Sequence, residues 1–154
     1  MIGHLVEWIP RLLTRAGLYV DVGPDLGPAA QWQVLADRLQ GFLDTPTIAG
    51  RQFDAGPPGT MTVEYAIGRL MLGDVLVHTW DLARGAGLDE QLDETCASEM
   101  LHAPQAIDEM LRSSGHYGPK VVLDDDADTT TRLVAFTGRD PSWPRPAPAS
   151  GNSR

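Results

Sequence analysis

The sequence predicts an all-α fold of four or five helices in a single domain. Apolar residues recur at helical spacing along most of the chain, and glycines and prolines gather between these stretches. Little of the sequence has the alternating pattern of a strand, and 154 residues are enough to bury a core. We expect residues 1–143 to form one helical domain and residues 144–154, rich in Pro, Ser and Ala, to be disordered.

The first two predicted helices cover residues 2–16 and 29–43. Residues 2–16 carry apolar side chains at helical spacing and stop at Gly17, a residue suited to a C-cap. Pro10 lacks a backbone N–H, so we expect it to kink or split this helix. A loop with several glycines and prolines follows over residues 21–28, and an amphipathic stripe then predicts the second helix.

The third predicted helix carries most of the candidate site. Residues 44–61 contain several prolines and glycines and are interpreted as a long connection. Thr62 is suited to cap a helix over residues 63–84, with Glu64 in the first turn, where the helix dipole favours a negative charge. Gly85 follows the last turn. Because most of the residues between Leu70 and Leu82 are apolar, we expect this helix to be central and buried.

The second half of the chain has a less regular pattern. Residues 91–112 are helical in their apolar spacing, with an interruption at Pro104. Residues 119–123 are interpreted as a short extended segment. Asp126 is expected to cap a final helix that stops at Gly138.

Composition and charge exclude several classes of protein. The formal net charge of −9 and the pI near 4.7 argue against nucleic acid and anionic membranes as the main partners. The single cysteine, Cys96, cannot form an internal disulfide, which is typical of a reducing compartment. No stretch reaches the roughly 18 consecutive apolar residues of a membrane span, and the N-terminus lacks a signal-peptide pattern. We therefore expect a soluble cytoplasmic protein.

Two polar residues on the apolar third helix are the first candidates for function. Asp74 and His78 are four residues apart, so they project from one face of a helix. If either side chain were buried without a partner, its desolvation would cost roughly 2–7 kcal/mol. The sequence therefore favours either a hydrogen bond between the two side chains or a metal ion that both of them bind.

A metal site needs a further ligand from another element. His4 lies at helical spacing with Trp8 and Leu12, on a face that we expect to pack inward. One carboxylate and two imidazoles suit Zn²⁺ or another first-row divalent ion, with a position left for water or substrate. Asp81, nearly one turn beyond His78 on the helix, is placed to hydrogen-bond a metal-ligating side chain without itself binding the metal.

Five segments, taken together and in order, carry a family resemblance. They are Gly3-His4-Leu5-Val6-Glu7-Trp8, Gly59-Thr60-Met61-Thr62-Val63, Asp74-Val-Leu-Val-His78-Thr-Trp-Asp81-Leu-Ala-Arg84, Gly115-His-Tyr-Gly-Pro119 and Phe136-Thr-Gly-Arg-Asp-Pro141. The chain resembles the actinobacterial metal-binding proteins related to mycothiol-dependent maleylpyruvate isomerase, which belong to the DinB-like superfamily. The resemblance covers residues 1–143.

The resemblance implies a DinB-like four-helix bundle that lacks its first helix and has a C-terminal helical extension. It also implies that His4, Asp74 and His78 are the metal ligands, with Asp74 standing where isomerase relatives have glutamate. The implied cofactors are a divalent metal, zinc above all, and mycothiol. The metal would activate the mycothiol thiol to attack an electrophilic substrate, giving an isomerase or S-transferase reaction.

Two further residues are candidates for substrate binding under this interpretation. Arg84, on the same helix as the two ligands, is placed to receive an anionic group, with a solvated surface arginine as the alternative. His116, in the Gly/Pro-rich fourth segment, is expected either to border the site or to cap backbone groups in a structural loop. Cys96 is interpreted as a core residue.

The absent first helix suggests a second function. It would leave an apolar groove, which in a soluble protein is an association surface. Three explanations of the absent helix are open: a start codon assigned too far downstream, a truncation rescued by dimerisation, and a degenerate paralogue. We favour the first. The alternative to an enzyme is a non-catalytic metal-binding or interaction module that forms a homodimer through this groove. A metal-free protein that needs only an Asp74–His78 hydrogen bond is the third interpretation.

Overall fold

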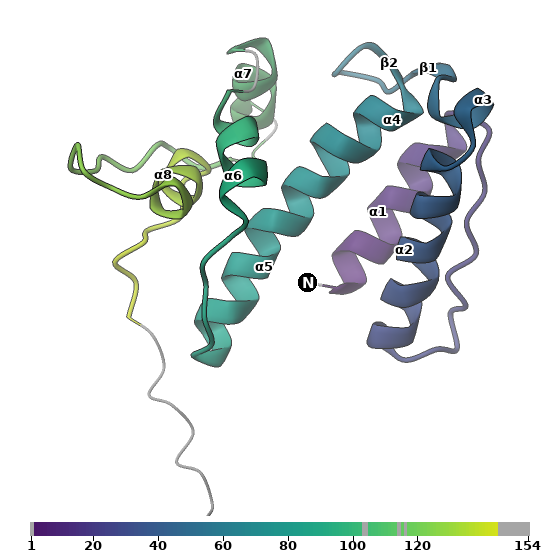
Figure 1. The fold of residues 1–154 in the computed structure, drawn as a ribbon. Helices are drawn as coiled ribbons and strands as arrows, with labels where there is room; N and C mark the ends of the chain where they lie inside the picture. Colours follow the sequence, from purple (N-terminus) through teal and green to yellow (C-terminus); the bar gives the residue numbers. More distant parts are fainter. Residues whose placement is uncertain (1, 103–104, 114, 116, 145–154) are drawn as a thin grey trace, which may run out of the picture. The chain divides into compact units, whose positions relative to one another are not determined.

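The computed structural model describes residues 2–102, 105–113, 115 and 117–144 and is predominantly helical, as predicted (Figure 1). The chain divides into two compact units, Met1–Val75 and Leu76–Arg154, and the division falls inside one helix. That residues 1–143 act as one domain stays a prediction. Residues 145–154, most of the predicted disordered tail, lie outside the described residues.

The first unit begins with the two helices that the sequence predicts. Helix α1 spans Ile2–Thr14 and helix α2 spans Pro28–Leu43. Helix α1 is not split at Pro10, which lies within its last two turns. Because a proline inside a helix removes only one backbone hydrogen bond, the buried face of α1 can hold the helix together across it. Pro28 occupies the first turn of α2, where its missing N–H has no helical partner to lose.

The connection predicted for residues 44–61 contains regular structure that the sequence analysis missed. It forms a one-turn helix α3 (Pro46–Ala49) and a hairpin of β1 (Gln52–Asp54) and β2 (Thr60–Thr62), antiparallel and with Phe53 opposite Met61. Each strand has three residues. This is too short for an alternating pattern to stand out against the prolines and glycines around it.

One continuous helical run follows the hairpin and carries the candidate ligands. It consists of α4 (Val63–Tyr65), the π-helical segment η1 (Ala66–Met71) and α5 (Leu72–Ala86). The predicted cap is confirmed, because the Thr62 hydroxyl accepts a hydrogen bond from the Tyr65 backbone N–H at 3.2 Å. The run ends two residues beyond the predicted boundary.

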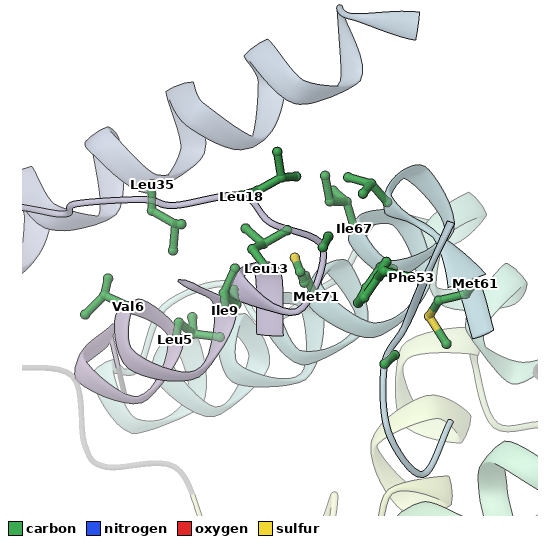
Figure 2. Packing of buried hydrophobic residues seen from close by; sticks show 14 residues of the cluster. Leu5, Val6, Ile9, Leu13, Leu18, Leu35, Phe53, Met61, Ile67 and Met71 are labelled. Atoms are coloured by element: carbon green, nitrogen blue, oxygen red, sulfur yellow. The ribbon is translucent and has the colours of Figure 1, made fainter. Parts of the chain in front are cut away.

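The core of the first unit is mostly aliphatic, with Phe53 and two methionines among its buried residues (Figure 2). Its centre is the buried stripe of α1, which continues onto residues of α2, the hairpin and η1. The largest buried side chains here are Ile9, Leu13, Leu35, Val63 and Met71. Burying one such side chain stabilises the fold by about 1.5–3 kcal/mol. The packing therefore fixes α1 against the helical run that bears Asp74.

The second unit contains three further helices, α6 (Glu94–Leu101), α7 (Gln105–Ser113) and α8 (Thr129–Phe136). Its core lies between α5, α6 and α8. The core residues are Leu76, Trp80, Leu92, Ala97, Leu133 and Val134. Pro104, where the sequence predicts an interruption, lies outside the described residues, and α6 and α7 lie on either side of it.

One prediction for the second unit needs correction. Asp128, and not Asp126, caps α8, because its carboxylate accepts from the backbone N–H of Thr131 at 2.8 Å and from its hydroxyl at 3.0 Å. Four aspartates lie between residues 124 and 128, so composition alone does not identify the capping one. Residues 119–123 lie outside any helix or strand, and that they are extended stays a prediction. Among the described residues, no helix is both long and apolar enough to cross a membrane.

Candidate metal centre

Asp74 lies two residues into α5 and interacts with α1. Its Oδ2 accepts a hydrogen bond from the indole N–H of Trp8 at 2.8 Å. The Nε2 atom of His4 lies 3.5 Å from the same oxygen. His4 and Trp8 are four residues apart on α1, so they share the face that meets Asp74. A carboxylate has lone pairs on two oxygens, so Asp74 can accept from Trp8 and still bind a cation.

His78 follows Asp74 by four residues on the continuous helix α5. Its ring Nδ1 lies 2.9 Å from Oδ2 of Asp81. An ionised carboxylate is only an acceptor, so this contact places a proton on Nδ1 and, in the neutral ring, the lone pair on Nε2. Metal-binding histidines are commonly held in this way by a carboxylate behind the ring. Asp81 thus contacts the ring of His78, and its role as the support of a metal ligand stays a prediction.

The three predicted ligands come together. One ligand atom each from His4, Asp74 and His78 lies within 4.8 Å of the other two. Ligand atoms about 2.1 Å from a tetrahedral zinc ion lie about 3.4 Å apart. The 3.5 Å separation of His4 Nε2 and Asp74 Oδ2 matches this value, and the other ligand-atom separations are at most 4.8 Å. The donor set therefore fits a zinc ion in chemistry and approximately in spacing.

The predicted burial of the site is wrong in one respect. The His4 side chain is 52% exposed, although the sequence analysis expected it to face inward. The buried stripe of α1 passes through Leu5, Ile9 and Leu13, and His4 lies at its edge with Trp8. His78 is less exposed, at 20%. The site is therefore a rim site with one buried side, not a site inside the core.

Arg139 contacts this site from the end of the second unit. Its Nε and Nη2 atoms bond Oδ1 and Oδ2 of Asp81 at 3.1 and 3.0 Å, so the guanidinium holds both carboxylate oxygens. The sequence analysis placed Arg139 in a family segment without assigning it a role, and it likewise missed the bond from Trp8 to Asp74. For Trp8, the four-residue spacing from His4 is the available signal. For Arg139 no local pattern pairs it with Asp81, 58 residues earlier.

Arg84, a predicted substrate-binding residue, is only 11% exposed in its side chain. Its guanidinium pairs with Glu90 at 2.7 Å, donates to the backbone carbonyls of Pro141 and Trp143, and lies over the Trp80 ring. It is therefore not a solvated surface arginine. These contacts tie the segment after α8 to α5, and a role in substrate binding stays a prediction.

A pocket of about 630 Å³ lies in the second unit, on the face of α5 that bears Trp80, Asp81 and Arg84. Arg139 and the largely exposed Trp143 complete its opposite side. The Asp81–Arg139 pair is thus both the support of His78 and part of the pocket wall. A small molecule in this pocket would contact the same carboxylate that holds the ring of His78.

The remaining candidates lie outside the cluster. His116 lies outside the described residues. Cys96 is half-buried on α6, and its hydrogen bond to the Asp93 carboxylate raises the pKa of the thiol above its ordinary value. A thiol with a raised pKa is a poor source of thiolate at neutral pH. Cys96 is therefore a weak candidate for a thiolate nucleophile.

No protein-family model, curated protein or solved structure matches this chain. Its function is therefore inferred from the geometry above and from the five segments that carry the resemblance.

Proposed function

We propose that this protein binds one divalent metal ion, zinc in particular, through His4, Asp74 and His78. We further propose that it uses the ion to activate a small-molecule thiol, mycothiol by the resemblance, in an isomerase or S-transferase reaction. A DinB-like helical bundle is part of this proposal. The observation that supports it is the convergence of these three side chains within 4.8 Å, from two segments about 70 residues apart in the sequence.

Each residue around the cluster has a defined task under this proposal. A bound divalent ion would lower the pKa of a coordinating thiol, so that thiolate forms at neutral pH. Trp8 holds one oxygen of Asp74, and Asp81 keeps the proton of His78 on Nδ1. Three protein ligands leave a position for an exogenous molecule, which is typical of catalytic zinc sites and not of structural ones. The exposed side of His4 gives such a molecule access.

Metal content tests the first half of the proposal. Untagged wild-type protein is compared with His78→Ala, His4→Ala and His102→Ala by plasma mass spectrometry after zinc reconstitution and desalting. His102 is an exposed histidine on the second unit whose Nδ1 contacts its own helix, so it serves as the matched control. We expect about one equivalent in wild type and His102→Ala, and a loss in the other two variants. A wild type without metal would contradict the proposal.

Thiol binding tests the second half. Cobalt-substituted wild type is titrated with mycothiol, and the ultraviolet thiolate-to-cobalt band is recorded. We expect the band to grow to saturation, and to be absent with the oxidised disulfide of the same thiol. A protein that binds cobalt but gives no band with the thiol would contradict the enzymatic function and leave the metal site itself standing. That outcome with a dimer in solution would favour the non-catalytic module.

A further inference from the structure

The Asp81–Arg139 ion pair is a two-point contact, and Asp81 also bonds the candidate ligand His78. Oδ2 of Asp81 lies 2.9 Å from His78 Nδ1 and 3.0 Å from Arg139 Nη2, while Oδ1 lies 3.1 Å from Arg139 Nε. A two-point contact of this kind fixes the plane of the carboxylate as well as its position. The direction in which Oδ2 faces His78 is therefore set by the guanidinium.

The turn that ends α8 places Arg139. The N–H of Arg139 bonds the carbonyl of Val134 at 3.0 Å, and that of Gly138 bonds Ala135 at 3.0 Å, the two bonds of a Schellman motif. Gly138 has a φ of 90°, and a Cβ there would lie 2.5 Å from the Gly118 Cα. The backbone of residue 118 thus presses against this turn, and the direction in which Arg139 leaves α8 is fixed by backbone contacts.

We propose that Arg139 is a positioning residue for the metal ligand His78, and that it acts through Asp81. This inference rests on the proposed metal site. Arg139 holds the Asp81 carboxylate in one orientation, Asp81 holds the proton of His78 on Nδ1, and the ring then presents Nε2 toward the metal position. The role requires the fork of a guanidinium, because the single ammonium of lysine cannot fix both carboxylate oxygens.

The first measurement needs no metal. The ring nitrogens of His78 are followed by ¹⁵N–¹H NMR in the metal-free protein, at mildly alkaline pH, where the chemical shifts report the tautomer. We expect wild type to be held as the Nδ1–H tautomer, and Arg139→Gln and Arg139→Lys to show a mixture of both. Arg132→Gln is the matched control, because Arg132 lies on α8 and its exposed guanidinium bonds the Asp125 carbonyl, away from Asp81 in the sequence.

The second measurement is zinc affinity by competition with a chromophoric chelator. Loss of a residue that supports a ligand weakens metal binding by about 10–100-fold. We expect this loss for Arg139→Gln and Arg139→Lys and less than about a twofold change for Arg132→Gln. In an Asp81→Asn background, Arg139→Gln should add little further loss, because the residue through which it acts has been altered.

The outcomes separate this inference from the proposed function. A wild type that binds no zinc contradicts the proposed function, and with it the metal part of the inference. A wild type that binds zinc while the Arg139 variants keep both its tautomer and its affinity contradicts the inference alone. Variants that unfold more easily but keep a single tautomer would show a purely structural role for Arg139 and would also overturn it.

Discussion

The two compact units differ in how buried apolar packing and hydrogen bonds from arginines contribute to their structure. In the first unit, Ile9 and Leu13 of α1 are fully buried among other apolar side chains (Figure 2). In the second unit, arginines bind loops as well as carboxylates. Arg84 donates to the carbonyls of Pro141 and Trp143, and Arg112 donates to those of Gly118 and Phe136. The first unit has such bonds too, from Arg15 to the Asp54 carbonyl and from Arg51 to the Ala16 carbonyl. Its buried cluster has 14 residues among those described, against 6 in the second unit, so packing contributes more in the first unit.

The two candidate histidines are also positioned in different ways. Packing positions the axis of α1, yet it leaves His4 at the edge of the buried stripe with half of its side chain exposed. His78 is held individually, through Asp81 and the guanidinium of Arg139. Apolar contacts are not directional, so they can bring a ligand near the metal without setting its orientation. Directed bonds can set the orientation, so we expect the ring of His78, which is also the less exposed of the two, to be well organised.

Truncating the packed core should have the largest effect on stability. Leu13→Ala removes a fully buried side chain of α1 and should lower the free energy of unfolding by about 2–5 kcal/mol. The matched control is Leu88→Ala, because Leu88 is 64% exposed, and this variant should change stability by less than about 0.5 kcal/mol. Urea denaturation followed by circular dichroism measures both. Equal losses in the free energy of unfolding for the two variants would contradict a first unit that is stabilised by its buried core.

Disturbing the glycine contact of the second unit should cost less. Gly138→Ala combines a left-handed backbone with a Cβ placed 2.5 Å from Gly118, so we expect a loss of about 2–4 kcal/mol in the free energy of unfolding. Gly59→Ala is the control, since Gly59 has a φ of 85° and nothing within 4 Å of the added carbon. It should cost only the backbone term, about 1 kcal/mol. A Gly138→Ala variant no worse than this control would show that the two backbones do not need their close approach.

The smallest effect is expected at a charged cluster of the second unit. Asp108 lies 2.8 Å from Arg112 Nε and 3.0 Å from Lys120 Nζ. Burial alone would raise the pKa of Asp108, but the bonds from Lys120 and Arg112 lower it below its ordinary value. A lowered pKa in the folded state means that this stabilisation is present above the unfolded pKa, about 3.9, and is lost as the pH falls through the folded pKa.

Asp108→Asn should therefore cost about 1–3 kcal/mol at neutral pH and make stability less dependent on pH in the acid range. Urea unfolding at a series of pH values from neutral to strongly acidic measures the difference. The exposed Asp125, changed to asparagine in the same way, should alter neutral-pH stability by less than about 0.5 kcal/mol. A constant difference between Asp108→Asn and wild type at every pH would contradict an ionic role for Asp108.

The helices and two of the three proposed ligands followed from local patterns. The cap at Thr62 and the four-residue spacing of Asp74 and His78 depend on neighbouring residues only, and both are as the sequence predicts. His4 was reached from its place on α1, but its exposure was misjudged, because periodicity identifies a face and not where the buried stripe has its edge. The short hairpin was missed because its strands are too brief to show a period.

The supporting residues could not be predicted from local patterns. Trp8 bonds Asp74 across 66 residues, and Arg139 bonds Asp81 across 58. Such pairs are decided by how helices and turns meet in three dimensions, and a single sequence carries no periodic signal for them. The prediction of the capping aspartate of α8 was wrong for a related reason. Several neighbouring aspartates are equivalent in the sequence, and the fold decides that Asp128 is the cap.

The π-helical segment η1 (Ala66–Met71) has a consequence for how this chain tolerates insertions and deletions. A π-helical turn accommodates an extra residue inside an otherwise α-helical run. Deleting one residue there would let the segment close to an ordinary α-helix, so the residues downstream would keep their sides of the helix. Deleting Gly73, which lies in α5, would instead turn everything downstream by about 100°, since an α-helix has about 3.6 residues per turn. Asp74 would then leave the side of the helix that meets Trp8. The π-helical segment is therefore the part of this helical run that can lose a residue while the Asp74 carboxylate still faces α1.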